Sequence, residues 1–174
     1  DVGCGSGILG IATLLLGADR AVGVDIDETA VRTAAENAEI NGVADRFTAI
    51  CGSFTDKVEG KYDIVLANIV ADAIMFLSKG IKDFMKDDAV YIMSGIIDTR
   101  AEEVKASVSQ YFDIIEEHLD NGWACFAARR AAVRQDPARA FHARLRTRHV
   151  VARGRDRRHH LEQGRGHVRK YDPC

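Results

Sequence analysis

The sequence predicts an α/β fold in which helices cover both faces of a mostly parallel, doubly wound sheet. Apolar runs of strand length alternate with segments whose apolar residues recur at helical spacing, and the connections between them are short. A glycine-rich loop opens the chain, and polar residues or glycines follow several of the strands. Because ligands bind at the carboxyl ends of the strands in such sheets, these residues define a candidate site.

The opening loop reads Asp1-Val-Gly-Cys-Gly-Ser-Gly7, with glycine at three alternate positions. Glycine adopts positive φ readily and lacks the Cβ atom that would keep a ligand away from the main chain. Residues 8–16 are almost wholly apolar and end at Gly17, which predicts a buried helix whose unpaired N–H groups face the loop. We therefore expect the loop to cradle a ligand.

Two strands with a helix between them are expected next. Residues 20–24 predict a short buried strand that ends on Asp25-Ile26-Asp27, and Asp27 is placed to cap the following helix. This helix carries apolar residues at helical spacing and stops at an Asn-Gly pair. Residues 47–50 predict the next strand, which ends on Cys51-Gly52-Ser53.

The same pattern continues in the second half of the domain. Residues 62–66 predict a strand that delivers Asn68 and Ile69 at its carboxyl end. A helix follows, bent or weakened at Gly80 because glycine costs a helix about 1 kcal/mol relative to alanine. Its expected apolar face consists of Ile74, Leu77, Ile81, Phe84 and Met85.

The last elements close the sheet. Residues 89–93 predict the next strand, with Ser94-Gly95 as its exit turn. Asp98 or Thr99 is placed to cap the next helix. An antiparallel strand pair is expected at residues 112–116 and 122–128.

Charge divides the chain near residue 130. Residues 131–174 hold 12 of the 24 Lys and Arg residues but only 4 of the 26 Asp and Glu residues. This segment has no apolar periodicity, so it predicts no packed core. We interpret residues 1–130 as the folded domain and residues 131–174 as an Arg- and His-rich tail that is disordered or read out of frame. An RNA-binding module in the tail is an alternative function, whereas the domain itself is not expected to bind nucleic acid.

Other function classes are excluded by what the sequence lacks. The four cysteines are far apart and form no Cys-x-x-Cys pair, which argues against a metal site. No run approaches the roughly 20 apolar residues of a membrane span, and no signal peptide is visible, so we expect a cytoplasmic protein with no membrane partner. The chain starts inside a motif and without Met, from which we infer that its natural N-terminus and most of the first strand are missing.

Two cofactors fit the glycine loop. The spacing Gly5-x-Gly7-x-x-Gly10, with Asp25 downstream, also matches a dinucleotide fingerprint, so an NAD-dependent oxidoreductase is an alternative. However, the glycine run begins earlier, at Gly3, with Asp1 before it. In addition, the strand predicted at residues 62–66 leads to Asn68, a polar residue that hydride transfer does not require there. Both details favour S-adenosyl-L-methionine.

S-adenosyl-L-methionine divides naturally among the predicted strand ends. The glycine loop would lie against the methionine part, Asp25 would accept hydrogen bonds from both ribose hydroxyls, and Cys51 and Gly52 would lie beside the adenine. The predicted cofactor-binding residues are Asp1, Gly3, Gly5, Gly7, Asp25, Ile26, Cys51, Gly52 and Asn68.

Asn68 and Ile69 are the predicted catalytic residues. Methyl transfer from a sulfonium is an in-line displacement that needs a neutral nucleophile aimed along the S–CH₃ axis. The Asn68 amide oxygen, helped by the Ile69 carbonyl, can accept the N–H bonds of an amine and point its lone pair at the methyl group. No dedicated base is visible, so the amine must lose its proton to water or on binding.

Six segments carry a resemblance to a known family. They are Asp1-Val-Gly-Cys-Gly-Ser-Gly-Ile-Leu9, Gly23-Val-Asp-Ile-Asp27, Glu36-Asn-Ala-Glu-Ile-Asn-Gly42, Ala67-Asn-Ile-Val-Ala-Asp72, Ser94-Gly-Ile-Ile97 and Gly122-Trp123. Together they resemble the catalytic domain of the bacterial PrmA family, over residues 1–130. The glycine loop and Asp25 are shared with many methyltransferases, whereas the fourth and fifth segments are much more particular.

The resemblance implies a Rossmann-like class I methyltransferase fold that uses S-adenosyl-L-methionine. It also implies that Gly3, Asp25 and Asn68 bind this cofactor. The substrate would be a ribosomal protein of the large-subunit stalk base, methylated on lysine side chains and on its N-terminal amine. Members of the family also have an N-terminal substrate-recognition domain and a linker, and neither has a counterpart in this sequence.

Overall fold

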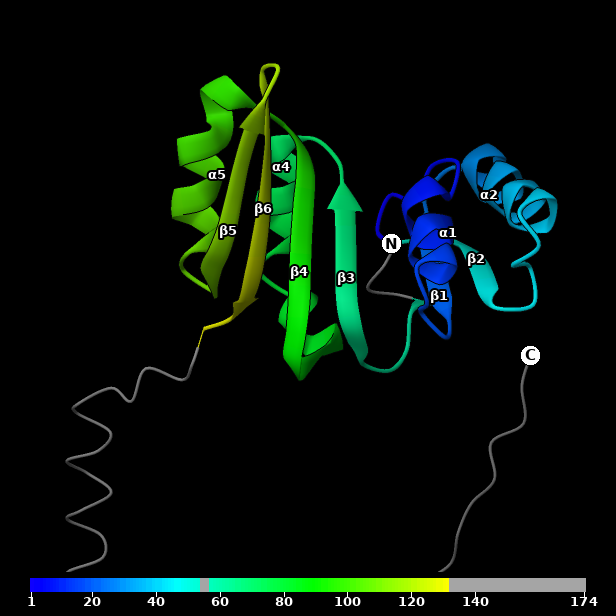
Figure 1. The fold of residues 1–174 in the computed structure, drawn as a ribbon. Helices are drawn as coiled ribbons and strands as arrows, with labels where there is room; N and C mark the ends of the chain where they lie inside the picture. Colours follow the sequence, from blue (N-terminus) through cyan, green and yellow to red (C-terminus); the bar gives the residue numbers. More distant parts are fainter. Residues whose placement is uncertain (54–56, 132–174) are drawn as a thin grey trace, which may run out of the picture. The chain divides into compact units, whose positions relative to one another are not determined.

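The computed structural model describes residues 1–53 and 57–131, which form a mixed α/β domain (Figure 1). Its strands are β1 (Ala21–Asp25), β2 (Phe47–Cys51), β3 (Tyr62–Asn68), β4 (Met85–Ile97), β5 (Phe112–Asp120) and β6 (Trp123–Arg130). Its α-helices are α1 (Ile8–Leu15), α2 (Glu28–Ile40), α4 (Ala71–Leu77) and α5 (Ala101–Val108), and its 3-10 helices are η1 (Ile81–Phe84) and η2 (Asp98–Arg100).

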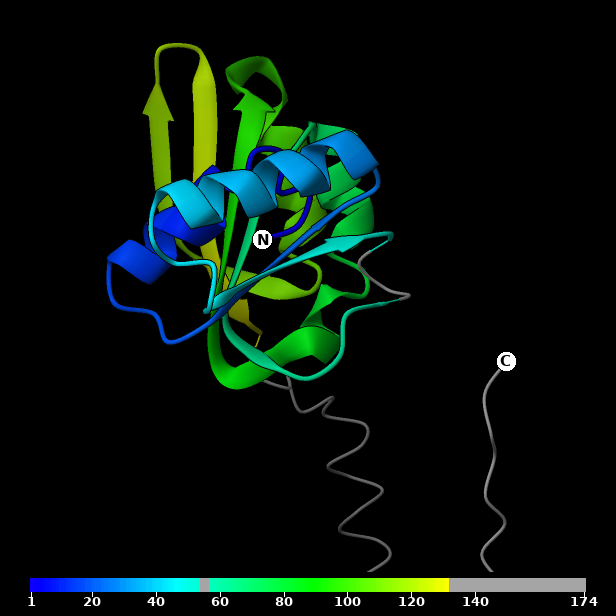
Figure 2. The ribbon, with the colours of Figure 1, turned by 90° about the vertical axis from the view of Figure 1, so that its right-hand side faces the viewer.

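The strands form two groups within one sheet. β1 pairs with β2 in parallel, and the other four strands lie in the order β3-β4-β6-β5. β3 and β4 are parallel, whereas β6 is antiparallel to both β4 and β5. Figure 2 shows how strongly the sheet twists, since β2 crosses the direction of β4 at a steep angle. The predicted parallel sheet with an antiparallel C-terminal pair is confirmed.

Val2 joins the two groups of strands. It bridges Val24 of β1 and Ala67 of β3, both in parallel. The Val2 N–H donates to Leu66 O at 2.8 Å, and the Gly3 N–H donates to Val24 O at 2.8 Å. Beyond this bridge, β1 and β3 border a cavity of about 660 Å³ instead of pairing with each other.

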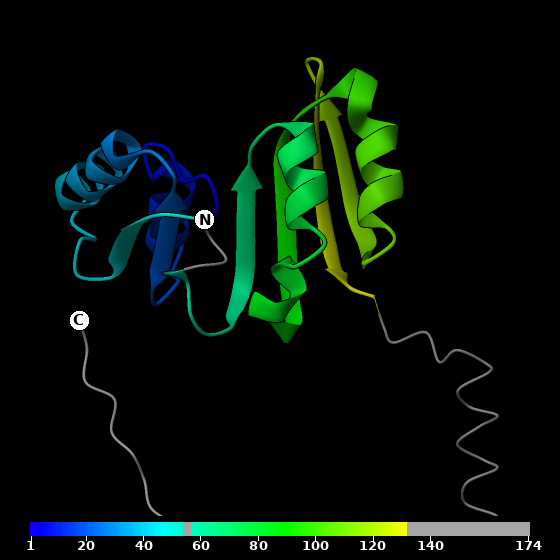
Figure 3. The ribbon, with the colours of Figure 1, turned by 180° about the vertical axis from the view of Figure 1, so that it is seen from behind.

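Each strand group has its own hydrophobic core. Helices α1 and α2 pack on β1 and β2. Helices α4 and α5 pack on the four-stranded group, on the other face of the sheet (Figures 1 and 3). The larger core includes Ile74, Tyr91, Val104, Phe112 and Phe126. The smaller core includes Ile11, Leu14, Ala34, Val43 and Phe47. The helices therefore cover both faces of the sheet, as predicted.

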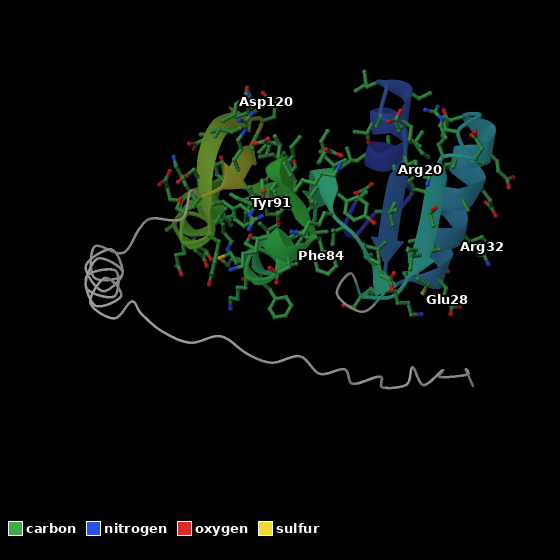
Figure 4. All side chains as sticks on the ribbon, turned by 90° about the horizontal axis from the view of Figure 1, so that it is seen from below. Arg20, Glu28, Arg32, Phe84, Tyr91 and Asp120 are labelled. Carbon is green, nitrogen blue, oxygen red and sulfur yellow. The ribbon has the colours of Figure 1, made fainter. Side chains whose placement is uncertain are left out.

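Tyr91 lies inside the larger core, among the side chains of β4 and its neighbours (Figure 4). Its ring packs against Phe112 with the centroids 5.5 Å apart. Burial raises the pKa of its phenol, so the hydroxyl stays protonated. The Ser78 hydroxyl lies beside the phenol, and it donates its own proton to Ile74 O at 2.7 Å.

The prediction of a helix that runs as far as Met85 is wrong in its extent. Helix α4 ends at Leu77, and the 3-10 helix η1 follows before Met85 begins β4. The expected apolar residues are nevertheless mostly in the core, because Ile74, Leu77, Ile81 and Met85 are all buried. Gly80, with φ of −121°, separates the two helical pieces.

Other predicted elements also need correction. Ser94 and Gly95 do not end the strand predicted at residues 89–93. This strand is β4, which continues to Ile97 through an irregularity between Met93 and Ile96. Neither predicted cap of the next helix is present, since Arg100 precedes α5 and makes no side-chain cap. The first helix is buried on one face only, and Ile8, Leu15 and Leu16 are exposed. The assignment of residues 132–174 to a tail lies outside the described residues.

Across the residues described, no helix is long and apolar enough to cross a membrane.

Candidate functional site

The glycine loop adopts the backbone that its sequence predicts. Gly3, Gly5 and Gly7 have φ of +67°, +52° and +79°, a region that other residues rarely occupy. A Cβ atom on Gly7 would lie 2.9 Å from Ala34 Cβ on α2. A Cβ atom on Gly5 would have no atom within 4 Å, so the middle of the loop faces open space. The loop is anchored at its ends and accessible at its centre.

Asp25 holds this loop in place from the end of β1. One carboxylate oxygen, Oδ2, accepts the Gly5 N–H at 2.9 Å, and the other accepts the Asp27 N–H at 3.0 Å. Asp27 in turn caps α2, as predicted, by accepting the Thr29 N–H at 2.8 Å. Asp25 is half-buried, and each of its oxygens keeps a further lone pair for a ligand.

Asp1 supports the other side of the loop. Its carboxylate accepts the Gly10 N–H at 3.0 Å, which satisfies an amide in the first turn of α1. The Asp1 backbone oxygen also accepts the Val24 N–H at 2.9 Å. The structure therefore gives Asp1 a positioning role beside the predicted cofactor-binding one.

The end of β2 lies directly beside Asp25. Cys51 pairs with Asp25 in the β1–β2 register, and the Gly52 N–H donates to Asp25 O at 2.9 Å. The Cys51 thiol contacts Ile26 O at 3.9 Å. Ile26 is 82% exposed, which leaves an apolar side chain uncovered at this edge. The four predicted residues at the ends of β1 and β2 thus form one cluster with the glycine loop.

Asn68 and Ile69 lie at the end of β3, against the irregular part of β4. The Ile69 N–H donates to Ser94 O at 3.2 Å. Gly95, with φ of +76°, approaches so closely that a Cβ there would lie 2.6 Å from Asn68 Oδ1 and 2.9 Å from Ile69 O. Any residue other than glycine at this position would therefore crowd both oxygens.

A shallow cavity of about 440 Å³, here called the acceptor cavity, opens over Asn68. It is lined by Asn68, Ile69, Val70, Ser94, Gly95 and Trp123. Sequence reasoning did not assign the last four of these residues to a site. The signal that could have found them is Trp123, the single tryptophan of the chain, which follows a tight turn where Asn121 and Gly122 have φ of +48° and +83°.

The two halves of the site meet at Gly3. A Cβ on Gly3 would lie 2.5 Å from Ile69 Cγ2, so the glycine loop and the end of β3 are in direct contact. Every predicted site residue lies either at the carboxyl ends of β1, β2 and β3 or in the glycine loop. Among the residues described, no three His, Cys, Asp or Glu side chains are grouped so as to hold a metal ion.

Two cysteines near the site have raised pKa values. Burial is the main cause for Cys4, and the Asp25 carboxylate adds to it. Burial is also the main cause for Cys125, next to Glu116. Both thiols therefore stay protonated and are poor nucleophiles at neutral pH.

Comparison with known proteins places this geometry in a family. The family model described as ribosomal protein L11 methyltransferase (PrmA) matches residues 1–131. A ribosomal protein L11 methyltransferase of Desulforamulus reducens is 45% identical over 127 residues, 72% of this chain and 41% of the relative. One from Campylobacter jejuni is 43% identical over 126 residues, 72% of this chain and 43% of the relative. The chain thus spans about two fifths of the length of these curated relatives.

Solved structures agree with this assignment. A crystal structure of ribosomal protein L11 methylase from Lactobacillus delbrueckii has a TM-score of 0.72 at 31% identity, covering 76% of this chain and 68% of that one. An RNA methyltransferase from Salinibacter ruber, in complex with S-adenosyl-L-homocysteine, has a TM-score of 0.62 at 18% identity, covering 78% and 82%. The second likeness is one of fold alone. The predicted Rossmann-like methyltransferase fold is confirmed, and the chain belongs to the ribosomal protein L11 methyltransferase (PrmA) family.

Proposed function

We propose that this chain is the catalytic part of an enzyme that methylates amino groups of a ribosomal protein, both lysine side chains and the N-terminal amine. The observation that carries the proposal is the contact between Gly3 and Ile69, where a Cβ atom would lie 2.5 Å from Ile69 Cγ2. This contact puts the loop suited to the methyl donor beside the strand end suited to the amine. Methyl transfer requires that juxtaposition.

The cofactor is S-adenosyl-L-methionine, as membership of a methyltransferase family implies. When bound, it supplies an electrophilic methyl group on a sulfonium. The residues present fit it, because the open centre of the loop at Gly5 admits a ligand against the main chain. Asp25, which has one lone pair left on each oxygen, would accept hydrogen bonds from the two ribose hydroxyls. Ile26, Cys51 and Gly52 would flank the adenine.

Asn68 and Ile69 would orient the amine. The Asn68 Oδ1 and Ile69 O atoms both lie against Gly95, where a Cβ atom would crowd them. Two oxygens accepting N–H bonds from a neutral amine fix the direction of its remaining lone pair. Positioning of this kind can supply most of the rate enhancement in an in-line displacement.

The proton of the amine has to leave before transfer. None of the residues that line the acceptor cavity is titratable. A lysine amine has a pKa of about 10.4 and an N-terminal amine about 7.7 to 8.0, so the neutral fraction of either rises with pH. The expected rate of transfer therefore increases from neutral to alkaline pH, more steeply for lysine.

The proposed substrate is ribosomal protein L11, the protein named in the family description. Its location at the stalk base, and a cytoplasmic site for the reaction, belong to the same proposal. Residues 1–130 carry 12 basic and 22 acidic side chains, and this negative charge favours approach of a basic protein.

Calorimetric titration of the chain tests the cofactor assignment. S-adenosyl-L-homocysteine should bind and NADH should give no heat. Binding of NADH with no response to S-adenosyl-L-homocysteine would overturn the proposal and favour the hydride-transfer alternative. Radiolabelled methyl transfer to L11 then tests the substrate, and Asn68→Ala should reduce transfer far more than it reduces binding of the nucleoside.

The RNA-binding alternative concerns residues 131–174, almost all of which lie outside the described part of the chain. Deletion of these residues should leave binding of S-adenosyl-L-homocysteine unchanged. Salt-sensitive RNA binding that disappears with the deletion would support the alternative as an additional function.

A further inference from the structure

We propose that Asn37 is a positioning residue for cofactor binding, which acts through the glycine loop and not by contact with the nucleoside. Its side-chain amide reaches from α2 and locks the peptide group between Ser6 and Gly7, which keeps the centre of the loop open to S-adenosyl-L-methionine. The inference rests on the cofactor site of the proposed function. It gives a role to residues 36–42, which carry part of the family resemblance but lie outside the site described above.

Helix α2 lies directly against the glycine loop because small residues face it. A Cβ atom on Gly7 would lie 2.9 Å from Ala34 Cβ and 3.2 Å from Ala34 Cα. Ala34 and Ala38 are both fully buried. Asn37 comes three residues after Ala34, so it lies on the same face of the helix, one turn further on. At this close approach, a side chain as short as that of asparagine reaches the main chain of the loop.

The Asn37 side chain bonds one end of a peptide group in the loop. Its Nδ2 atom donates to Ser6 O at 2.8 Å. The Gly7 N–H, at the other end of the same peptide group, donates to Cys4 O at 2.8 Å. Because both ends are bonded, the peptide group cannot rotate without losing two hydrogen bonds.

Asn37 differs in kind from the other side chains that hold the loop. Asp25 accepts the Gly5 N–H at 2.9 Å, and Asp1 accepts the Gly10 N–H at 3.0 Å. Across residues 1–53 and 57–131, Asn37 is the one side chain that donates a hydrogen bond to a main-chain oxygen of the loop. The two carboxylates therefore orient N–H groups, whereas Asn37 orients a carbonyl.

The direction of this carbonyl matters because the centre of the loop is open. A Cβ atom on Gly5 would have nothing within 4 Å. Without Asn37, the Ser6 oxygen is free to turn toward this opening, since the glycines on either side of Ser6 resist rotation little. An oxygen turned that way would repel the carboxylate in the methionine part of the cofactor. Asn37 should therefore raise the affinity for the cofactor without contacting it.

The fold itself should depend little on Asn37. The residue is half-buried, and it lies within α2, where alanine is a better helix former than asparagine. Asn37→Ala should therefore reduce the affinity for the cofactor and leave the stability of the domain nearly unchanged. A purely structural residue would lower both together.

Calorimetric titration with S-adenosyl-L-homocysteine tests the inference. Asn37→Ala should weaken binding about fivefold, the loss expected for one hydrogen bond, and its melting temperature should stay within about 2 °C of that of the parent chain. Asn41→Ala is the matched control, because Asn41 Nδ2 also donates to a main-chain oxygen, that of Asn37 at 2.8 Å, but bonds within α2. Its affinity should equal that of the parent chain.

Two further variants separate the hydrogen bond from the shape of the side chain. Asn37→Asp keeps the size but places an acceptor opposite Ser6 O, so it should bind the nucleoside more weakly than Asn37→Ala does. Asn37→Gln keeps the donor, so it should recover part of the affinity that Asn37→Ala loses.

The outcomes distinguish this inference from the proposed function. If the parent chain does not bind S-adenosyl-L-homocysteine, the proposed function is overturned. If the parent chain binds it and Asn37→Ala binds no more weakly than Asn41→Ala, only the role of Asn37 is overturned. Melting of Asn37→Ala far below the parent chain would also overturn that role, because Asn37 would then support the whole fold and not the loop in particular.

Discussion

At the scale of single residues, Asp25 combines two tasks that are often divided between side chains. Its carboxylate accepts the Gly5 N–H at 2.9 Å and the Asp27 N–H at 3.0 Å, so it orders both the glycine loop and the entry to α2. The same oxygens are the proposed acceptors for the ribose. Loss of this side chain should therefore disturb the loop as well as remove two contacts to the ligand.

Asp25→Ala should weaken binding of S-adenosyl-L-homocysteine by about 100-fold or more, since hydrogen bonds to charged groups contribute about 1.5 to 3 kcal/mol each. Asp25→Asn keeps one acceptor oxygen, so its affinity for S-adenosyl-L-homocysteine should lie between those of Asp25→Ala and the parent chain. Calorimetric titration gives the dissociation constants. An unchanged constant for Asp25→Ala would contradict the ribose assignment.

Gly3→Ala should destabilise the domain through two separate effects. Its φ of +67° is unfavourable for alanine by about 1 to 2 kcal/mol, and the new Cβ would meet Ile69 Cγ2 at 2.5 Å. Gly42→Ala is a matched control, because Gly42 has φ of +68° and nothing within 4 Å of the added atom. The free energy of unfolding, measured with urea, should fall further for Gly3→Ala.

The contact with Ile69 accounts for that difference, so Ile69→Ala should remove it. In the double variant with Gly3→Ala, the extra loss relative to Gly42→Ala should largely disappear. If the two single variants, Gly3→Ala and Gly42→Ala, lose the same free energy of unfolding, the prediction is contradicted. The glycine loop would then move away from Ile69 at no cost in stability.

At the scale of elements, the strand ends were predictable and the details of β4 were not. A polar or glycine residue directly after an apolar run identifies the end of a strand, and this found Asp25, Cys51 and Asn68. Apolar spacing continued across Gly80 into Met85, so periodicity alone could not separate a helix from the strand after it.

The acceptor cavity could not be predicted from the sequence, for a related reason. Gly95 and Trp123 reach Asn68 only because β4 pairs with both β3 and β6, through an irregularity between Met93 and Ile96. Contacts between segments far apart in the chain depend on register, which no local pattern reveals.

Arg100 joins two of the helical elements through ion pairs. Its guanidinium lies 2.8 Å from Asp72 of α4 and 2.8 Å from Glu103 of α5. Hydrogen bonds from Arg100 lower the pKa values of both carboxyls. A lowered pKa adds stability above the ordinary carboxyl pKa of about 4, and this stability is lost as the pH falls through the lowered values.

Arg100→Met should therefore lower the melting temperature by a few degrees at neutral pH, because exposed pairs contribute modestly. The difference from the parent chain should shrink below about pH 4 as the two carboxyls protonate. Thermal melts followed by circular dichroism over this range provide the measurement. A difference that does not change with pH would mean that packing, not charge, explains the effect.

At the scale of the whole domain, stability should be unequal because the two cores are separate. The four-stranded group has a larger continuous core than β1 and β2 with their helices. Val2 supplies the only strand bridges between the groups within the residues described. Local opening of the smaller group should therefore not require opening of the larger one.

Hydrogen exchange measured by mass spectrometry should show this difference. Amides of β4 and β6 should exchange more slowly than those of β1 and β2, where opening exposes fewer buried side chains. Saturation with S-adenosyl-L-homocysteine should slow the exchange of β1 and β2, since the proposed ligand contacts both. Equal exchange rates across all six strands would indicate one cooperative unit instead.

The bridge at Val2 also affects how the molecule behaves toward other chains. Beyond that residue, the edges of β1 and β3 that border the cavity have no strand partner in the described part of the chain. Unpaired strand edges are templates for intermolecular β-pairing, and Ile64 on β3 is 45% exposed beside them. Both edges border the same cavity, so one extended segment lying there would pair with both and remove the template.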